Sequence, residues 1–350
     1  MARKVPWTEQ EIAKLSHGYH VDNLTCREIH ERLLPNRSED AIQLKLGNLR
    51  REQATQSKGF SVDMPPRLAR ETGPLLDHLR QEFERKAAHH KGKRHININI
   101  EKPGPYGLFF FGDAHLGDPG CDLGQLAAHM CMVRDNSDLY AVNMGDLSNN
   151  WVGRLQALYA HQTVTDDEER KLIQWLLKEI DWLFVILGNH DKWSPLAGHL
   201  CEEAGVAYAS HGAKLYIKSL DSVEPCVVDA AHTHKGNSQY NPAHAQLVQN
   251  YRGNNADIII GAHIHQGGYT IRGNGISEKI GHCIRLGAYK RYDDFADRLG
   301  FEPDMIGPAC ICVVDPSKTG VGFVTTFIDV DEGLEFLKMK RELFRRKAAA

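Results

Sequence analysis

Residues 108–115 have the sequence LFFFGDAH, in which a continuous apolar run ends in an Asp and a His. Continuous apolar runs are typical of strands that are buried on both faces of a parallel sheet. The same arrangement occurs four more times, at 139–149 (LYAVNMGDLSN), 182–191 (WLFVILGNHD), 226–232 (CVVDAAH) and 257–265 (DIIIGAHIH). We therefore predict strands over residues 108–111, 139–144, 182–187, 226–229 and 257–260, each with polar residues at its carboxyl end.

The polar ends of these strands are predicted to converge, because open α/β sheets bind ligands at the carboxyl ends of their strands. Carboxylates, an amide oxygen and neutral imidazoles are the ligands of borderline-hard divalent metals. Taken singly, a Gly-Asp or a His-x-His is usually a turn or a hydrogen-bonded pair in a loop. The repeated strand context makes the whole set indicative of a metal site.

Composition restricts the class of protein. The chain has 350 residues with 42% hydrophobic content, which is enough for about two domains with a real core. No apolar run approaches the ~20 residues of a membrane span, and the N-terminus has no signal-peptide apolar region. The eight cysteines form no CxxC pair, which favours buried free thiols in a reducing, cytoplasmic setting.

Charge is unevenly distributed along the chain. Residues 1–100 carry 18 Lys and Arg against 13 Asp and Glu, whereas the remainder carries 24 against 32. A basic segment attached to an acidic body indicates a module that faces a polyanion. The alternative is a solvated surface of uneven composition.

Residues 1–55 are predicted to form a small domain of three helices. Thr8 with Glu11, and Thr25 with Glu28, have the spacing of capping boxes at the starts of two helices, and the third is expected after Ser38. The apolar residues expected to face inward are Ile12, Leu15, Ile29, Leu33, Leu34, Ala41, Ile42, Leu44, Leu46 and Leu49.

The polar, basic third helix fits the helix-turn-helix class, whose last helix enters the DNA major groove. The string PWTEQE at 6–11, followed by Ile29, Leu33, Arg37-Ser38 and Lys45-Leu46, resembles the Myb/SANT-like family over about the first fifty residues. Only one of that family's spaced tryptophans is present. The resemblance implies DNA as a partner, and we expect Lys45, Arg50 and Arg51 to contact it. The alternative is a helical cap that binds protein or oligomerises.

Two further segments flank the predicted metal-binding body. Residues 56–104 are expected to form a linker with Gly and Pro, an amphipathic helix marked by Leu75, Leu76, Leu79 and Phe83, and a leading strand at 95–100. Residues 332–350 are expected to form a basic C-terminal helix or tail.

Residues 105–331 closely resemble the calcineurin-like metallophosphoesterases. The motifs are Asp113-x-His115, Gly145-Asp146-x-x-Asn149, Gly188-Asn189-His190-Asp191, His232 and Ala262-His263-x-His265, in the family's order. The departure is Ala262, where the family has Gly, and this substitution costs little unless φ there is positive. The resemblance implies an α/β fold with a β-sandwich flanked by helices, in four αββα layers.

The resemblance also implies a role for each motif residue. Asp146 matches the residue that bridges two divalent cations, Mn²⁺ being favoured over Fe or Zn²⁺. Asp113, His115 and His265 would complete one site, and Asn189, His232 and His263 the other. His190 matches a catalytic histidine that protonates the leaving oxygen after attack by a hydroxide between the two metals. Asp191 would orient the imidazole of His190.

Some assignments stay open at the sequence level. His232 and His234 both follow the fourth strand, and only one needs to bind metal. We favour His232 as the ligand and expect His234 to face the substrate or to support a metal ligand. Asn149 is expected to contact phosphate or to support its loop. Asp118 and Asp122 are expected to be loop carboxylates or caps for a helix near Leu123.

These patterns predict a metal-dependent phosphoesterase that cleaves phosphodiesters, with DNA as the favoured substrate, acting as a nuclease or phosphodiesterase. The first alternative is a phosphodiesterase or phosphomonoesterase for small cyclic or linear nucleotides, in which the N-terminal domain serves regulation or assembly. The second is a DNA-binding regulator whose phosphoesterase body serves interaction. The family resemblance makes a homodimer a candidate assembly, although no segment of the sequence marks an interface.

Overall fold

The computed structural model describes residues 6–56, 72–236, 238, 240–274, 279–292 and 306–349. The chain separates into two compact units, Met1–Asp77 and His78–Ala350, called here the N-terminal unit and the body. Most of the predicted linker, residues 57–71, lies outside the described residues, and the predicted domain boundaries stay predictions. Within the described ranges, no helix combines the length and hydrophobicity needed to cross a membrane.

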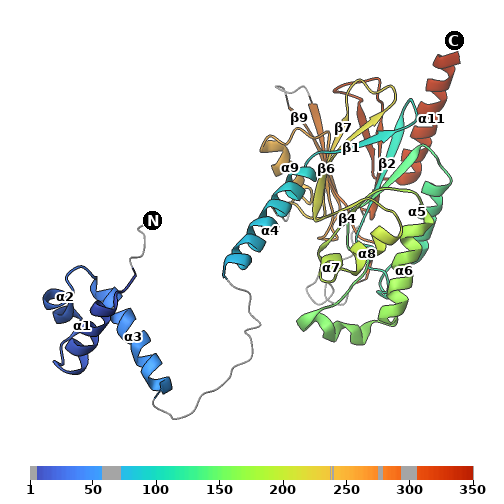
Figure 1. The fold of residues 1–350 in the computed structure, drawn as a ribbon. Coiled ribbons are helices and arrows are strands. Elements are labelled where there is room, and N and C mark those ends of the chain that lie inside the picture. The colour runs from blue at the N-terminus through green and yellow to red at the C-terminus, as the bar shows by residue number, and fades with distance from the viewer. Residues whose placement is uncertain are drawn as a thin grey trace. The chain divides into compact units, whose positions relative to one another are not determined.

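The N-terminal unit contains the three predicted helices, α1 (Glu9–His20), α2 (Cys26–Arg32) and α3 (Glu39–Gln56) (Figure 1). Both predicted capping boxes are present. The Thr8 hydroxyl accepts from the Glu11 backbone N–H, and Thr25 does the same with Glu28. Each box satisfies backbone N–H groups that have no partner inside the helix.

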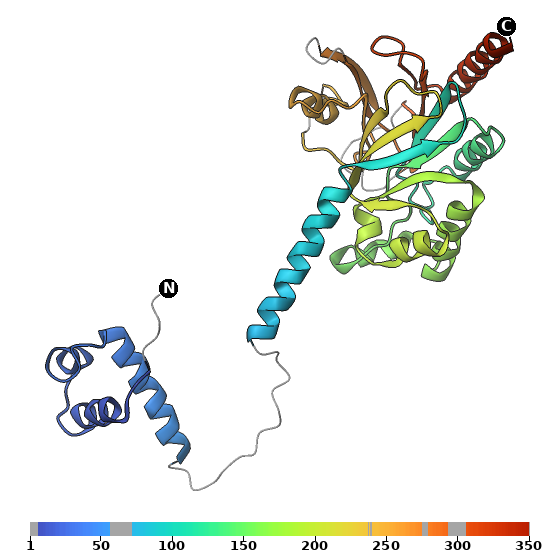
Figure 2. The same ribbon diagram turned by 45° about the horizontal axis from the view of Figure 1, so that its top comes forward.

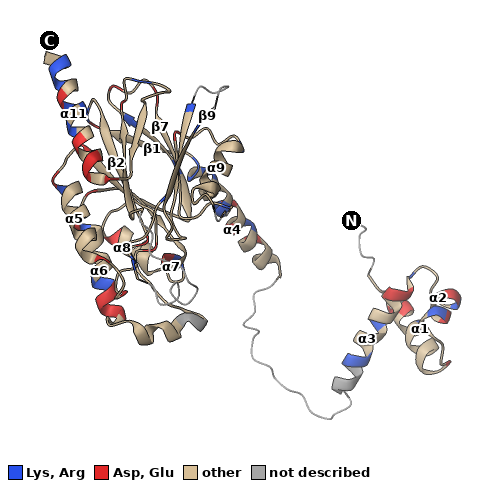
Figure 3. Ribbon diagram, turned by 180° about the vertical axis from the view of Figure 1, so that it is seen from behind, with Lys and Arg blue, Asp and Glu red and all other residues tan. Residues whose placement is uncertain are grey.

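The core of the N-terminal unit contains most of the predicted apolar residues, including the fully buried Leu15, Ile29 and Ile42. The prediction for Leu44 is wrong, because its side chain is 69% exposed. Successive residues turn by about 100° around a helix, so Leu44 points away from the face that Ile42 and Leu46 share. Figure 3 shows Lys and Arg further along α3, after an acidic first turn.

Helix α4 (Thr72–Gly92) leads directly into strand β1 (Ile96–Ile100), as Figure 2 shows. The predicted helix therefore forms, but its apolar residues are exposed, from 39% for Leu75 to 73% for Phe83. The predicted strand is confirmed, and its isoleucines are half-buried or buried while its asparagines are exposed.

The described part of the body holds two six-stranded sheets. In the first sheet the order is β1, β6 (Gly212–Ser219), β7 (Cys226–Ala231), β8 (Ile258–Gly261), β10 (Lys279–Arg285) and β9 (Gly268–Asn274). In the second sheet it is β12 (Val324–Phe327), β11 (Ala309–Val314), β2 (Tyr106–Phe111), β3 (Leu139–Asn143), β4 (Trp182–Leu187) and β5 (Tyr208–Ser210). The five predicted strands are therefore present, but three lie in the second sheet and two in the first.

Alternation along β2 shows how the layers form, since successive side chains of a strand point to opposite faces. Leu108 and Phe110 enter the core between the two sheets, whereas Phe109 and Phe111 enter the core between the second sheet and its helices. Those helices are α5 (Leu123–Arg134), α6 (Asp166–Glu179), α8 (Leu196–Glu203) and α11 (Val330–Ala349) (Figure 1). Helix α9 (His244–Tyr251) covers the first sheet, so the αββα fold is confirmed.

The strands that carry the motifs run parallel within each sheet. Strand β2 pairs in parallel with β3 and β3 with β4, while β7 pairs in parallel with β8. Their carboxyl ends lie at one edge of the sandwich, where backbone bonds join the segments, such as the N–H of Asp113 to the carbonyl of Gly145. This arrangement brings distant motifs into one site, as between Asp113 and His263, which are 150 residues apart.

Candidate metal centre

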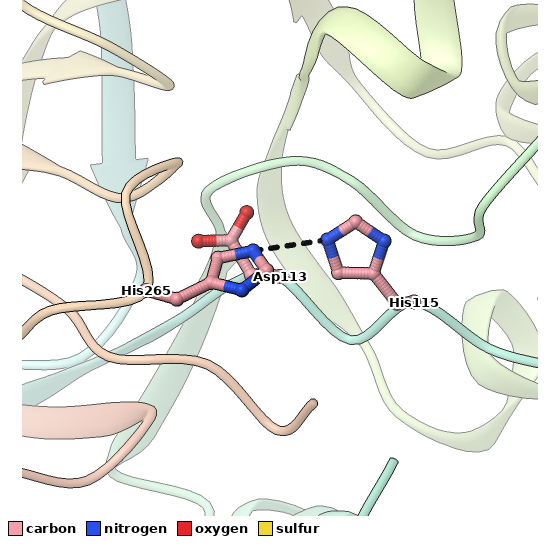
Figure 4. Close-up of side chains that lie close together, drawn as sticks. All are labelled: Asp113, His115 and His265. Atoms are coloured by element: carbon pink, nitrogen blue, oxygen red, sulfur yellow. Dashed lines mark hydrogen bonds between the residues drawn. The ribbon is translucent and has the colours of Figure 1, made fainter. Parts of the chain in front are cut away.

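The first cluster of donor atoms consists of Asp113, His115 and His265, whose candidate ligand atoms lie within 4.8 Å of one another. Figure 4 shows these three side chains gathered together, with the Nε2 atoms of His115 and His265 3.1 Å apart. Asp113 is fully buried and His115 is 2% exposed. The end of β2 therefore supplies two donors and the loop after β8 supplies the third.

The second cluster consists of Asp146, His232 and His263, again within 4.8 Å. The His232 Nε2 atom lies 3.1 Å from His263 Nδ1 and 2.9 Å from the side-chain oxygen of Asn189. Asn189 begins the short helix α7 (Asn189–Lys192), directly after β4. The predicted amide donor therefore belongs to this cluster.

Asp146 connects the two clusters. Its Oδ2 atom lies 3.2 Å from His232 Nε2 in the second cluster and 4.0 Å from His115 Nε2 in the first. Its Oδ1 atom accepts from the backbone N–H of His190 at 3.0 Å, which fixes the orientation of the carboxylate. One carboxylate oxygen thus faces both groups of donors, as a bridging ligand must.

The imidazole rings are oriented by hydrogen bonds on their far sides. His232 Nδ1 lies 2.8 Å from the carbonyl of Met144, and because a carbonyl can only accept, this nitrogen carries the proton. His115 Nδ1 lies 2.9 Å from the side-chain oxygen of Asn149. Both Nε2 lone pairs then point into the clusters, as in metal-binding histidines, whose other ring nitrogen usually donates to an oxygen.

The backbone at the site is strained. Positive φ angles occur at Asp113 (50°), His115 (45°), Asp146 (53°), His263 (79°) and His265 (59°). Non-glycine residues rarely adopt this region, and such strain concentrates at functional sites. Ala262 has no positive φ, so the departure from the family motif costs nothing in backbone conformation.

Gly188 is required by close approach rather than by its φ angle. A Cβ atom there would lie 2.2 Å from Asp146 Oδ1 and 2.7 Å from the Asp146 backbone nitrogen. Any side chain at this position would therefore displace the bridging carboxylate. The glycine in the Gly-Asn-His-Asp motif is explained by this contact.

Burial sets the direction of the pKa shift at three of the donors, Asp113, His115 and His263. It raises the pKa of Asp113 to about 8, with help from the charge of Asp146 and against the opposing charge of His232. Burial lowers the pKa of His115 and of His263, so both imidazoles favour the neutral form that binds metal. Burial also opposes the charge on His232, but the hydrogen bond and charge of Asp146 raise its pKa to about 9.

The residues present fit a pair of divalent cations. The Oδ1 atom of Asp113 is buried and, among the described residues, has no hydrogen-bond partner. Leaving a buried carboxylate oxygen unpaired is costly, and a cation removes that cost. The donors in both clusters are oxygen and imidazole nitrogen, without thiolate, which suits Mn²⁺, Fe or Zn²⁺.

The sequence prediction for Asp191 is wrong in its contact. His190 Nδ1 lies 2.5 Å from the backbone carbonyl of Asn149, which orients the ring in place of Asp191. The Asp191 carboxylate instead accepts from the backbone N–H groups of Asp146, Leu147 and Gly188 at 2.8 to 2.9 Å. Asp191 therefore holds together the loops after β3 and β4, and its effect on chemistry is through the position of Asp146.

The structure also corrects the role assigned to His234. Its side chain is only 6% exposed, and its Nε2 atom lies 3.6 Å from Asp229 Oδ2. His234 packs against β8, because a Cβ atom on Gly261 would lie 3.2 Å from the Nδ1 atom of His234. The residue does not line the cavity described below and does not face a substrate there, whereas His232 lies in the second cluster.

A cavity of about 570 Å³ opens over the two clusters. The donors His115, Asp146, His263 and His265 line it, together with His190 and Asn149. Asn149 supports the loop, as predicted, because its amide donates to Asp118 at 2.8 Å while its oxygens contact His115 and His190. Asp122 caps α5, which confirms the other loop prediction.

The cavity is also lined by residues that the motifs do not predict, among them Trp151, Trp193, Lys290 and Tyr292. Two of them are close to motifs, since Trp151 follows Asn149 by two residues and Trp193 follows Asp191 by two. Their position close to the motifs could have identified these two tryptophans as candidate site residues. Lys290 is 8% exposed and its Nζ lies 2.9 Å from Asp118 Oδ2, so it places a cation beside the donors.

The predicted DNA-contacting residues lie on α3 in the N-terminal unit. Arg50 and Arg51 are exposed and Lys45 is half-buried. The Arg50 guanidinium lies over the ring of Tyr19, 4.5 Å from its centroid. The basic side chains are therefore presented along one helix, and their predicted role in DNA binding stays a prediction.

No protein-family model and no curated protein matches the sequence. Among solved structures, the chain is similar to the calcineurin-like phosphoesterase YfkN from Bacillus subtilis, with 12% identity, 67% of this chain and 100% of that one covered, and a TM-score of 0.35. For the nuclease MPE from Pseudomonas putida, the corresponding values are 12%, 63%, 87% and 0.31. For a predicted phosphoesterase from Streptococcus pneumoniae they are 11%, 64%, 97% and 0.28.

The named neighbours are thus phosphoesterases and a nuclease. At these identities and TM-scores, the similarity does not add to a functional assignment. The arrangement of donor atoms in this chain is the stronger indication of its chemistry.

Proposed function

We propose that the protein is a phosphoesterase that uses two divalent cations to hydrolyse phosphodiester bonds, with DNA as its substrate. The observation that carries this proposal is the position of Asp146 Oδ2, which lies between the two clusters of buried donors. Two-metal sites of this kind clamp both sides of a phosphoryl group during in-line displacement. A single structural metal would not need a shared carboxylate.

One cation would be held by Asp113, His115, His265 and Asp146, and the other by Asn189, His232, His263 and Asp146. The cations would neutralise the phosphoryl oxygens and make water more acidic. We propose Mn²⁺ as the native metal, because the mixed oxygen and nitrogen donors suit it and the family resemblance of the motifs favours it.

His190 is the proposed general acid. Its Nδ1 proton is committed to the Asn149 carbonyl, so Nε2 is the atom free to exchange a proton in the cavity. Nε2 lies 3.9 Å from Asp146 Oδ2, the carboxylate oxygen that faces both donor clusters, so a phosphoryl group held at those clusters would lie within its reach. As the oxygen of a hydroxide ion bonds to phosphorus and the ester P–O bond breaks, the protonated His190 gives its Nε2 proton to the departing oxygen, which leaves as an alcohol.

The preference for DNA is proposed from the N-terminal unit. Its third helix carries Lys45, Arg50 and Arg51, which can neutralise phosphates without reading sequence. Attaching such a unit to the body raises the local concentration of a polynucleotide substrate. It would have no such effect on a small ester.

Hydrolysis of bis-p-nitrophenyl phosphate tests the reaction. The protein with Mn²⁺ is expected to turn it over, and a chelator is expected to stop it. His190→Ala is expected to lower kcat on a DNA oligonucleotide by about 10² to 10⁴, the range for a general acid, and to lower it much less on the nitrophenyl ester, whose leaving group needs no proton, while cation binding by calorimetry is retained. Absence of turnover with Mn²⁺, Fe²⁺ and Zn²⁺ would contradict the proposal.

A charge variant tests the substrate. The triple substitution Lys45→Gln, Arg50→Gln, Arg51→Gln is expected to lower activity on DNA at low salt by about tenfold or more, and to flatten its salt dependence. The control pair Arg27→Gln, Arg32→Gln removes two exposed positive charges on α2. Equal losses on DNA and on the small ester would favour the small-nucleotide alternative.

A further inference from the structure

The wall of the cavity beside His190 is aromatic. Trp193 lies against His190 with ring centroids 4.1 Å apart, and Trp151 lies 5.1 Å from the same ring. The two indoles are 6.3 Å apart and inclined by 36°. Both line the cavity, and we call this pair the tryptophan wall.

The tryptophan wall is not part of the hydrophobic core. Of the five tryptophans in the chain, Trp175 and Trp182 pack against the core between the second sheet and its helices, and Trp7 packs in the N-terminal unit. Trp151 and Trp193 belong to none of the buried clusters formed by the described residues. Two large apolar rings that face a cavity instead of a core indicate a binding surface.

The surroundings of the wall restrict what it can bind. Lys290 Nζ lies 5.5 Å from the centroid of Trp151 and is paired with Asp118, so positive charge and hydrogen-bonding groups lie next to the indole faces. The metal donors His115, His263 and His265 line the same cavity. A phosphate ester with its phosphoryl group at the donors and a flat, partly polar ring system at the wall would match these surroundings.

We propose that the tryptophan wall stacks against the nucleobase of the nucleotide whose phosphate is hydrolysed; this inference rests on the proposed function of the same site. A base can reach the wall only after it has left the stack of a duplex. The substrate is therefore a single strand or an unpaired end. Stacking on aromatic side chains tolerates every base, so the wall selects nucleotides without reading sequence.

Two esters with the same leaving group test the proposal. Thymidine 5′-(p-nitrophenyl phosphate) carries a base, and methyl p-nitrophenyl phosphate does not. Trp151→Leu is expected to lower the ratio of kcat/KM between the thymidine and methyl esters by about tenfold, chiefly through KM, because base stacking on one ring is worth roughly 5- to 150-fold in binding. Trp151→Phe retains a ring face and should restore most of this ratio.

Trp193 is tested with the same two esters. Here the ratio of their kcat/KM values is needed to separate base stacking from a general effect on His190. Trp193→Leu removes a ring that touches His190, so it is expected to lower the rate with both esters, and the thymidine ester by the larger factor. Trp175→Phe on α6 is the matched control, and it is expected to leave the ratio unchanged. An unchanged ratio in the Trp151 and Trp193 variants would overturn the proposal, because it would mean that the wall only positions His190 or contacts the nitrophenyl group.

A binding measurement separates this proposal from the proposed function. Thymidine 5′-monophosphate is expected to quench the fluorescence of the protein, and Trp151→Leu is expected to weaken that binding about tenfold. Ribose 5-phosphate, which has no base, should bind equally to both proteins. Failure to hydrolyse either ester with intact quenching would contradict the proposed function alone, whereas equal nucleotide affinity in wild type and variant would overturn the stacking surface.

Discussion

The strand-end site of the body and the N-terminal unit differ in how well their local interactions are satisfied. The site holds five non-glycine residues at positive φ, buried carboxylates and an unpaired carboxylate oxygen. The N-terminal unit has two complete capping boxes, an aliphatic core and a bidentate ion pair between Arg37 and Glu11. Its described residues include one positive φ outside glycine, at Asn23, a residue type that tolerates it.

This difference separates residues that serve folding from residues that serve chemistry. Strain and unpaired polar groups persist only where the surrounding structure enforces them and function requires them. In the body, the two cores on either side of the second sheet supply that support. Substitutions that relax the site should therefore stabilise the protein and lower activity, whereas those in the capping boxes and core of the N-terminal unit should change stability alone.

Asp113→Asn is expected to have the largest effect. Loss of a metal ligand should lower kcat/KM by about a thousandfold or more, since metal charge stabilisation is worth several kcal/mol. An amide carries no charge to bury beside Asp146, and its oxygen can still accept from the His263 N–H, as Asp113 does at 2.7 Å. The metal-stripped variant should therefore melt about 2 to 4 °C above the metal-stripped wild type.

Activity assays with Mn²⁺ and thermal unfolding in a chelator measure the two effects separately. A melting temperature that falls together with activity would show that Asp113 stabilises the fold, and this result would contradict the contrast between the two regions.

Asn149→Ala is expected to have an intermediate effect, because it removes the contact of Asn149 with His115 and keeps its contact with His190. The substitution deletes the oxygen that orients His115 but keeps the backbone carbonyl that orients His190. Cation affinity should fall about 10- to 100-fold, as for other residues that orient metal ligands. At saturating cation, kcat should change much less, because the His190 contact is intact.

Calorimetric titration with Mn²⁺, followed by assays at saturating cation, checks this prediction. Asn149→Asp keeps an acceptor for His115 and should retain more of the affinity than the alanine variant. If kcat at saturation falls as far as affinity, the side chain of Asn149 contacts the substrate rather than the ligand shell.

The sequence predicts the donor residues of the body better than it predicts how the strands are divided between the two sheets. Strand β4 has the predicted bounds, and the other four motif strands differ from the prediction by one or two residues at their ends. The division of these strands between two sheets could not be predicted, because buried strands of either sheet have the same apolar pattern. The donor residues could be predicted because each follows the end of an apolar strand, and this succession is visible in the sequence.

Contacts made by backbone atoms and by residues outside motifs were not predictable. The carbonyl of Asn149 orients His190, yet a carbonyl has no signature in sequence. Asp191 was assigned to His190 because the two are adjacent, but α7 turns its carboxylate toward three backbone N–H groups. The tryptophan wall could not be predicted, because a single Trp in a sequence is equally consistent with a position in the hydrophobic core.

Glu11→Gln in the N-terminal unit is expected to have the smallest effect, limited to stability. The Arg37 guanidinium and the Thr8 N–H lower the pKa of Glu11 to about 2 from an ordinary value of about 4.5. Because the folded state has the lower pKa, the ionised carboxylate stabilises folding above about pH 4.5, and this contribution disappears as the pH falls toward 2. A fragment of residues 1–77 contains one tryptophan, Trp7. The Trp7 ring lies 4.8 Å from the Arg37 guanidinium, so its fluorescence in the fragment reports on the folding of this unit. Urea unfolding followed by its fluorescence should show wild type more stable than Glu11→Gln at pH 7 and equal to it near pH 2. A difference that stays constant over this range would mean that the substitution alters the packing of the α1 N-terminus and not the charge that Arg37 faces.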